Sequence, residues 1–375
     1  MNQINPFIIE GYLSPEYFCD RVEETAILTG HLRNQRNVAL IAPRRLGKSG
    51  LIHHCFGQDE IRNGYLTFYV DIYDTKNLSE FTMELGHCIF NTQKSKGRKV
   101  WESFVAMLKS LKTGISFDIN GMPEWSVSLG EIRSPEVLLD EIFDYLEHAD
   151  KPCLVAIDEF QVVADYPEKK AEAALRKRIQ DCHNVHFIYS GSKRHMMTEI
   201  FVTQSRPFYN SSALMEVCPI DMSRYEQFAN HHLHTVAKFI SHEAFSHLYE
   251  RFDGITWYIQ YVLNVLYADS HTGELQKADI EEAIATILQR SSFAYQVLLF
   301  QLASRQKELL RAIATEVKVD KIMSGNFLQR YHLTSSTVQG ALKALLDRDF
   351  VTNEEGQYQV YDKFFGLWLS SARIG

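Results

Sequence analysis

The chain has 375 residues, of which 45% are hydrophobic and 23% charged, a balance typical of a globular protein with two or three domains. Its net charge of −8 excludes a surface that is basic throughout, although a local basic patch stays compatible with it. The sequence has no long apolar run and no basic leader, so we expect no membrane span, no signal peptide and a cytoplasmic location. The six cysteines form no Cys-x-x-Cys pair, which favours free, buried thiols.

The first half of the chain alternates short apolar strands with helices. The predicted strands are Val38–Ile41, Tyr65–Asp71, Pro152–Asp158 and Val185–Ser190, and the predicted helices between them include Gly47–Cys55 and Asn77–Asn91. Residues 115–129 alternate around Asn120-Gly121 as an inserted hairpin, and Ser134-Pro135 opens a further helix. Apolar strands separated by helices indicate a parallel sheet that is covered on both faces.

After about residue 220 the pattern changes to helices only. Apolar residues recur at helical spacing over Met222–Phe239, Ser241–Arg251, Thr256–Ala268 and Lys277–Gln289. From residue 301 the predicted units are shorter: helices at 305–315, 325–331 and 335–347, then strands at 350–353 and 357–361. Three helices followed by a hairpin is the winged-helix order.

Residues 42–49 have the pattern of a phosphate-binding loop, or Walker A motif, between a strand and a helix. Backbone N–H groups of such a loop point at phosphate, Gly47 permits close approach, Lys48 reaches the β- and γ-phosphates, and Ser49 offers its hydroxyl to Mg²⁺. Alanine stands where the motif has its first glycine. A chance Gly-Lys-Ser is the alternative, but the flanking strand and helix argue against it. The predicted nucleotide-binding residues here are Ala42, Pro43, Arg44, Arg45, Leu46, Gly47, Lys48, Ser49 and Gly50.

Two carboxylates follow the apolar strand at 153–157, as in a Walker B motif. We predict that Asp158 holds Mg²⁺, and that Glu159 orients or deprotonates the attacking water. A solvated acidic turn is the alternative. The next strand ends in small polar residues, where enzymes of this kind place a sensor of the γ-phosphate. Ser190 and Ser192 are both candidates, and a turn-forming hydroxyl is the alternative for each. The predicted catalytic set is Glu159, Lys48 and Ser190.

The order of these motifs resembles that of the archaeal-type ATPases, a family within the AAA+/STAND group of P-loop proteins. The resemblance covers most of the chain and rests on Asn-Pro-Phe near the start, Asp20-Arg21-x-x-Glu24, the loop with Pro43-Arg44-Arg45, Phe160-Gln161 after the carboxylates, and the winged helix. It implies an α/β fold with an AAA+/ASCE-type parallel sheet whose central strand carries the P-loop, followed by an all-helical lid and a winged-helix domain. The implied domains are 1–220, 221–295 and 296–375.

The resemblance also implies roles for residues outside the loop. Asp20 and Arg21 would lie beside the adenine, and Gly254 would meet the nucleotide from the lid, although Thr256 replaces the proline of that motif. The arginine that the family carries after a Pro-Leu-Tyr-Gly segment is absent. The alternatives for contacting a γ-phosphate are Arg194, Arg206 and Arg224, each of which also fits a surface arginine.

The sequence therefore predicts a Mg²⁺-dependent ATPase in which ATP drives switching of the lid and winged helix, with slow or partner-dependent turnover. The missing arginine and Ala42 favour a non-hydrolysing switch as the second hypothesis. An ATP-controlled DNA-binding regulator is the third. Residues 305–375 hold ten Lys and Arg against eight Asp and Glu, so support for DNA as a partner is weak. A protein partner or a homo-oligomer is also compatible with the sequence, and no membrane is expected.

Overall fold

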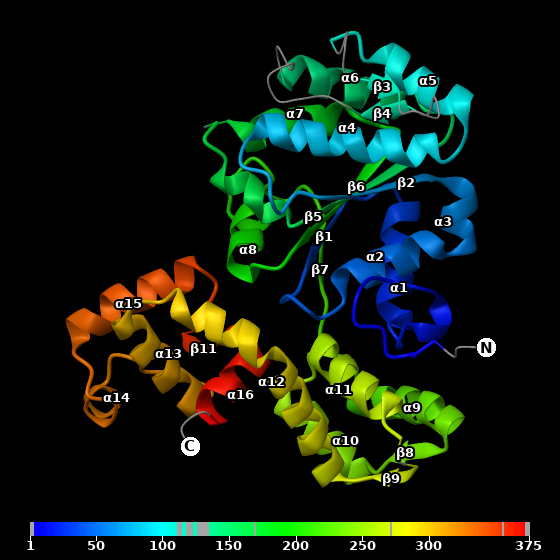
Figure 1. Cartoon of the computed structure of the whole chain (residues 1–375). Coiled ribbons are helices and arrows are strands. Elements are labelled where there is room, and N and C mark those ends of the chain that lie inside the picture. The colour runs from blue at the N-terminus through cyan, green and yellow to red at the C-terminus, as the bar shows by residue number, and fades with distance from the viewer. Residues whose placement is uncertain are drawn as a thin grey trace. The chain divides into compact units, whose positions relative to one another are not determined.

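The computed structural model describes residues 4–110, 115–117, 123–125, 135–168, 170–270, 272–354 and 356–371. The chain divides into two compact units (Figure 1). Unit 1 comprises Met1–Phe228 with Gly254–Gln260, and unit 2 comprises Ala229–Asp253 with Tyr261–Gly375. The predicted division into three domains stays a prediction.

Unit 1 contains a five-stranded parallel sheet in the order β2-β5-β6-β1-β7. Its strands are β1 Val38–Ile41, β2 Leu66–Asp71, β5 Cys153–Asp158, β6 Val185–Gly191 and β7 Ala213–Glu216. The central strand of this order is β6, whereas the P-loop follows β1, which lies next to it. The prediction that the central strand carries the P-loop is therefore wrong. The prediction missed β7, which pairs with β1 on its outer side, because only Met215 of β7 is buried and the apolar signal is weak.

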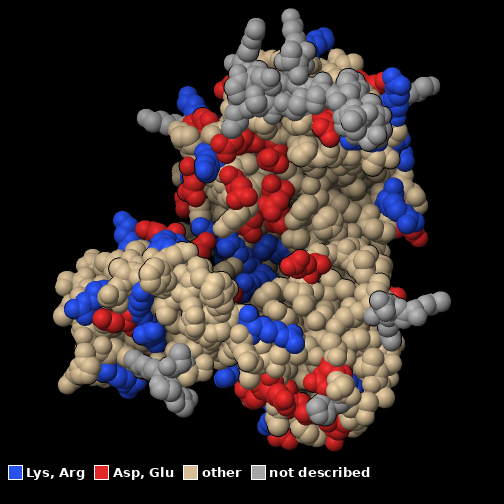
Figure 2. Space-filling view, in the orientation of Figure 1, with Lys and Arg blue, Asp and Glu red and all other residues tan. Residues whose placement is uncertain are grey.

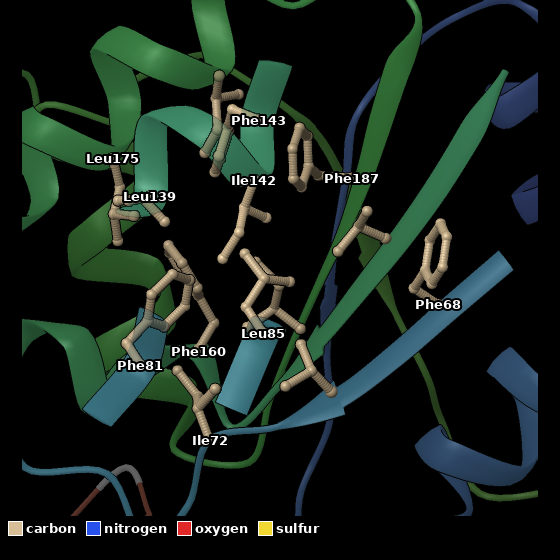
Figure 3. Close-up of a cluster of buried hydrophobic side chains, with 14 of the residues drawn as sticks. Phe68, Ile72, Phe81, Leu85, Leu139, Ile142, Phe143, Phe160, Leu175 and Phe187 are labelled. Carbon is tan, nitrogen blue, oxygen red and sulfur yellow. The ribbon is translucent and has the colours of Figure 1, made fainter. Parts of the chain in front are cut away.

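Helices cover both faces of this sheet, and successive residues of each strand face opposite layers. Val38 and Leu40 pack with α1 Val22–Arg33, α2 Lys48–Gly57 and α3 Asp59–Gly64. The other layer is shown in part in Figure 3, where Phe68 and Phe187 of the sheet lie with side chains of the covering helices. The helices of that layer are α4 Leu78–Lys94, α5 Arg98–Met107, α6 Pro135–Glu147, α7 Ala171–Asp181 and α8 Arg194–Val202.

Shorter elements complete unit 1. They are η1 Pro15–Tyr17, η3 Phe160–Asp165, and strands β3 Ile115–Phe117 and β4 Pro123–Trp125. The antiparallel pairing of β3 with β4 confirms the inserted hairpin. Its expected turn at Asn120-Gly121, and the expected cap Ser134, lie outside the described residues.

The region after residue 220 is mainly helical, as predicted, but it also contains a pair of short strands that the prediction missed. Its helices are α9 Met222–Leu233, η4 His234–Val236, α10 His242–Arg251, α11 Thr256–Ala268 and α12 Lys277–Phe300. The predicted helix Met222–Phe239 ends early, because strand β8 Lys238–Ile240 pairs in parallel with β9 Gly273–Leu275. The lid is therefore not all-helical. Lys238 explains the change of structure: its buried ammonium donates to the carbonyls of Leu266 (2.6 Å), Tyr267 (3.3 Å) and Asp269 (2.7 Å), at the end of α11.

The C-terminal part of unit 2 is the expected winged helix. Its elements are α13 Ser304–Glu316, α14 Gly325–Arg330, α15 Ser335–Asp347, β10 Val351–Glu354, β11 Gln357–Val360 and α16 Lys363–Ser371. The hydroxyl of Thr334 caps α15 by accepting from the backbone N–H of Thr337, as expected. Helix α16 packs Phe364, Phe365 and Leu369 into the buried core.

Candidate nucleotide site

The phosphate loop joins β1 to α2 and has two residues with positive φ. Gly47, at φ 91°, stands before the first residue of α2, in a conformation that favours glycine. Arg45, at φ 69°, adopts the left-handed region despite its side chain. Its guanidinium lies over the rings of Trp257 (4.3 Å) and Tyr258 (4.9 Å) and donates to the Tyr258 hydroxyl, while the backbone N–H of Trp257 donates to the Arg45 carbonyl (3.1 Å). These contacts offset the strain at Arg45.

Lys48 is buried, and its ammonium is turned back onto the loop. It donates to the carbonyls of Ala42 (3.0 Å) and Pro43 (3.4 Å). Burial lowers the pKa of Lys48, while the negative charges of Glu159 and Asp158 act in the opposite direction. A buried ammonium held by two neutral carbonyls is well suited to an anion, since phosphate oxygens are stronger acceptors.

Asp158 ends β5 and meets Ser49 as the motifs predict. Its Oδ2 accepts from Ser49 Oγ (2.8 Å) and from the hydroxyl of Tyr69, and its Oδ1 accepts from the Glu159 N–H (3.0 Å). Burial alone would raise the pKa of Asp158, but hydrogen bonds from Tyr69 and Ser49, together with the positive charge of Lys48, hold it below its ordinary value. An ionised carboxylate beside a hydroxyl is an oxygen donor set that fits Mg²⁺.

Glu159 follows in a left-handed conformation, at φ 56°, and is only half-buried. Its Oε2 accepts from Ser192 Oγ (2.6 Å) and from the side-chain amide of Gln161 (2.5 Å). Ser192 Oγ in turn accepts from Arg44 Nε (3.3 Å). Of the two serines proposed as sensors, Ser192 contacts Glu159, whereas Ser190 is fully buried and contributes to the environment of Asp158.

A cavity of about 490 Å³ in unit 1 joins these groups. Residues 44–50 of the loop, Asp158 and Glu159 line it, but Ala42 and Pro43 do not. A second wall comes from several residues between Ile8 and Arg21, among them Phe18, whose ring stacks on His54 at 4.4 Å between ring centroids. Tyr12 also lines this wall, and its hydroxyl bonds to Nδ1 of His54 (3.0 Å).

Of the two residues predicted to lie beside the adenine, Arg21 lines the cavity and Asp20 does not. Arg21 lines the cavity, but its buried guanidinium donates to Glu24 (2.6 Å) and to the carbonyls of Cys218 (2.6 Å) and Leu46 (3.2 Å). It thus braces the segment against the loop. Asp20 does not line the cavity and accepts from Arg224 (3.1 Å).

The three alternative arginines are paired with carboxylates elsewhere. Arg194 pairs with Glu216 (2.9 Å), Arg206 with Glu172 (2.8 Å), and Arg224 with Asp20. None lines the described cavity, whereas Arg44 and Arg45 of the loop do. Thr256 and Trp257, just after Gly254, also line it, and Thr256 Oγ1 donates to the Leu46 carbonyl (3.5 Å).

Sequence reasoning missed Tyr12, Tyr69, Trp257 and Tyr258 as parts of this site. Tyr69 carries the clearest signal, because a polar tip in an apolar parallel strand needs a partner at the sheet edge. The other three belong to no motif with a defined spacing. The roles predicted for the site residues remain predictions.

Comparisons with known proteins bear on the fold. A family profile described as "Probable winged helix domain" matches residues 293–371. The Walker-type ATPase of Pyrococcus abyssi is 17% identical, with a TM-score of 0.62 over 97% of this chain and 99% of that one. The ORC2 protein of Aeropyrum pernix in ADPNP and ADP complexes is 13% identical, with a TM-score of 0.58 over 100% and 99% of the two chains. No curated protein matches the sequence.

A third solved structure, the ORC1 protein of Aeropyrum pernix in complex with DNA, is 12% identical, with a TM-score of 0.52 over 96% of each chain. The expected fold class is thereby confirmed: the chain has a parallel α/β core like that of these solved structures, helical regions and a C-terminal winged helix. Among the helices that the structure describes, none has the length and apolar character needed to cross a membrane.

Proposed function

We propose that this chain, which has the fold of the archaeal AAA+ ATPases, binds ATP with Mg²⁺ in the unit 1 cavity and hydrolyses it. The observation that carries the proposal is the meeting of Ser49 and Asp158 at 2.8 Å beside the buried Lys48, with Glu159 lining the same cavity. This arrangement provides an anion site, a site for a hard cation and an additional carboxylate in the same cavity.

Binding would begin at the loop. Phosphate oxygens would replace the Ala42 and Pro43 carbonyls on the Lys48 ammonium, and the N-terminus of α2 would add its N–H groups. The aromatic wall of Tyr12 and Phe18 would pack against the flat face of the base. Ser49 and Asp158 would hold Mg²⁺, which neutralises charge on the phosphates when it is bound.

Glu159 is the residue best placed to act on water. It follows Asp158 directly, it is half-buried, and it lines the cavity. Donors on Oε2 fix its orientation, as a base that must meet a water molecule in line with the γ-phosphate requires. We assign it as the general base and Lys48 as the group that stabilises charge on the transferred phosphoryl.

The test is Mg²⁺-dependent phosphate release by wild type, Glu159→Gln and Lys48→Ala. We expect Glu159→Gln to retain ATP binding and to lose at least about a hundredfold in turnover, and Lys48→Ala to lose binding. A wild type that binds ATP but releases phosphate no faster than Glu159→Gln would contradict hydrolysis by the isolated chain. It would instead support either a non-hydrolysing switch or hydrolysis that requires an arginine from a partner or a second copy.

Switching would reach the remainder of the chain through α11. Thr256 and Trp257, at the start of this helix, contact the loop carbonyls, and the same helix continues to Ala268 in unit 2. A loop that changes its geometry on binding phosphate would therefore change the forces on a continuous helix. This route supports the proposed coupling of ATP to the lid and winged helix.

DNA binding is a second candidate function for the winged helix. The related ORC1 structure contains DNA, and α15 of this chain presents an exposed polar stripe that includes Ser336, Gln339 and Lys343. Basic side chains on the face of this region shown in Figure 2 form no continuous surface, and Glu354 of β10 is exposed. The polar stripe supports contact with DNA, whereas the scattered basic side chains and the exposed Glu354 argue that the contact is weak.

A further inference from the structure

A chain of three hydrogen-bonded side chains links the phosphate loop to Glu159. Arg44 Nε donates to Ser192 Oγ at 3.3 Å, and Ser192 Oγ donates to Glu159 Oε2 at 2.6 Å. A hydroxyl has one proton, so a serine that donates to the carboxylate can only accept from the guanidinium. The direction from Arg44 to Glu159 is therefore fixed by chemistry.

The two ends of this relay face the place where phosphate would bind. Arg44 and Glu159 both line the cavity, together with Lys48. The positive charge of Arg44 is close enough to Lys48 to contribute to lowering its pKa, after the larger effect of burial. The guanidinium carbon of Arg44 also lies over the ring of Tyr73, 5.0 Å from its centroid. The relay thus starts inside the anion site and ends at the carboxylate assigned as the base.

The neighbouring Arg45 is engaged in a different way. Its guanidinium is held over Trp257 and Tyr258, away from Ser192, although both arginines belong to the same loop. Consecutive arginines therefore have separate attachments: Arg45 to the start of α11 and Arg44 to the end of β6 through Ser192. This difference supplies a matched pair for testing.

We propose that Arg44 recognises the γ-phosphate and that Ser192 transmits this recognition to Glu159, as positioning residues of the proposed ATPase. The inference rests on the proposed function and adds to it a means of telling ATP from ADP. With ADP bound, Arg44 stays on Ser192, which holds Glu159 as seen here. A γ-phosphate offers the guanidinium a charged acceptor in place of a neutral hydroxyl. Ser192 Oγ then loses the hydrogen bond from Arg44. Because hydrogen bonds in a chain polarise one another, the bond from Ser192 to Glu159 changes in strength as well.

The first measurement is calorimetric affinity for ATP and for ADP, with Mg²⁺ and with EDTA. We expect wild type to prefer ATP about tenfold, and Arg44→Gln to bring this preference close to one while ADP affinity is retained. Retained ADP affinity also shows that the variant is folded. Arg45→Gln is the control: because Arg45 also lines the cavity, any loss of affinity should be equal for ATP and ADP, so that the ratio of the two affinities stays at the wild-type value. If Arg44→Gln keeps the wild-type preference, the inference is wrong even where the chain hydrolyses ATP.

The second measurement is a double-mutant cycle on single-turnover hydrolysis. Arg44→Gln and Ser192→Ala should each slow the step about tenfold, and the double variant should be no slower than the slower single variant. In the control cycle, the effects of Arg45→Gln and Ser192→Ala should multiply. Multiplying effects of Arg44→Gln and Ser192→Ala would overturn the relay.

The two measurements separate failure of the relay from failure of the proposed function. If wild type binds ATP without hydrolysing it, the ATPase proposal fails, and the ratio of ATP to ADP affinity in Arg44→Gln alone decides on γ-phosphate recognition. If wild type binds neither nucleotide, both proposals are overturned together.

Discussion

At the scale of single residues, the site is held together by polar contacts between elements that are distant in sequence. Ser49 and Asp158 are 109 residues apart, yet parallel strands bring their carboxyl ends to one sheet edge. Motif spacing was sufficient to predict that meeting, because both residues follow apolar strands. The hydrogen bond from Tyr69 to Asp158 and the relay through Ser192 could not be predicted in the same way. They depend on register and side-chain direction, which no motif specifies.

Tyr69 gives a prediction about the metal. Its hydroxyl donates to Asp158 Oδ2, and this bond helps to keep the pKa of Asp158 low. Tyr69→Phe removes the donor from a buried carboxylate, so the pKa of Asp158 should rise and its share in holding Mg²⁺ should weaken. We expect the Mg²⁺ concentration for half-maximal ATP binding to rise several-fold, most strongly at acidic pH, in calorimetric titrations.

The direction of the change with pH follows from the expected rise in the pKa of Asp158 in Tyr69→Phe. Below the pKa of Asp158 the carboxylate is protonated and cannot hold the cation, so raising this pKa extends the acidic range in which Mg²⁺ is lost. ADP binding in EDTA should be unchanged in Tyr69→Phe, because no cation is involved. Tyr209→Phe, at a tyrosine that is 43% exposed, is the control. An unaltered Mg²⁺ dependence in Tyr69→Phe would show that its hydroxyl is dispensable for the carboxylate.

At the scale of elements, apolar periodicity predicted that a helix or strand is present more reliably than it predicted where the element ends. Strand β1, helix α11 and helix α15 match their predicted bounds. Helix α12 instead runs on from the expected Gln289 to Phe300, and α9 stops at Leu233. The early stop depends on tertiary structure: Ala237 has φ 57°, and the next residue, Lys238, turns inward to bind the end of α11. A lysine is normally read as a surface residue, so the sequence pattern favoured a longer helix.

Lys238 therefore gives a prediction about stability. It is 2% exposed and donates to three carbonyls. Lys238→Met keeps the apolar stem but leaves those carbonyls without their donor, which should lower the free energy of unfolding by about 1–3 kcal/mol. Urea denaturation followed by circular dichroism measures this change. Lys277→Met, at an exposed lysine that starts α12, should be within about 0.5 kcal/mol of wild type. Equal stability of both variants would contradict a capping role for Lys238.

At the scale of the whole molecule, charge bears most directly on DNA. The chain carries a net charge of −8, and the stripe on α15 contains one lysine, Lys343. We expect duplex DNA to bind weakly in fluorescence anisotropy at low salt and to dissociate as salt rises. Each phosphate contact contributes about −0.9 to the slope of log K against log salt concentration.

Lys343→Ala should reduce this slope by about one if α15 contacts a phosphate through that lysine. Lys277→Ala in the same unit should leave the slope unchanged. Binding that does not depend on salt, or that is unaffected by Lys343→Ala, would contradict the proposed DNA contact and favour a protein partner for the winged helix.

The stacking of Arg45 on Trp257 has a consequence for observing the molecule. A cation over an indole ring alters the light that the ring emits, and Trp257 is the tryptophan that lines the cavity. The other three differ in setting: Trp101 and Trp125 pack against the hydrophobic core, and Trp368 donates to Ser292. The chain thus carries its own optical probe at the phosphate loop. With Trp257→Phe as the blank, stopped-flow emission can time the arrival of a nucleotide without any added dye.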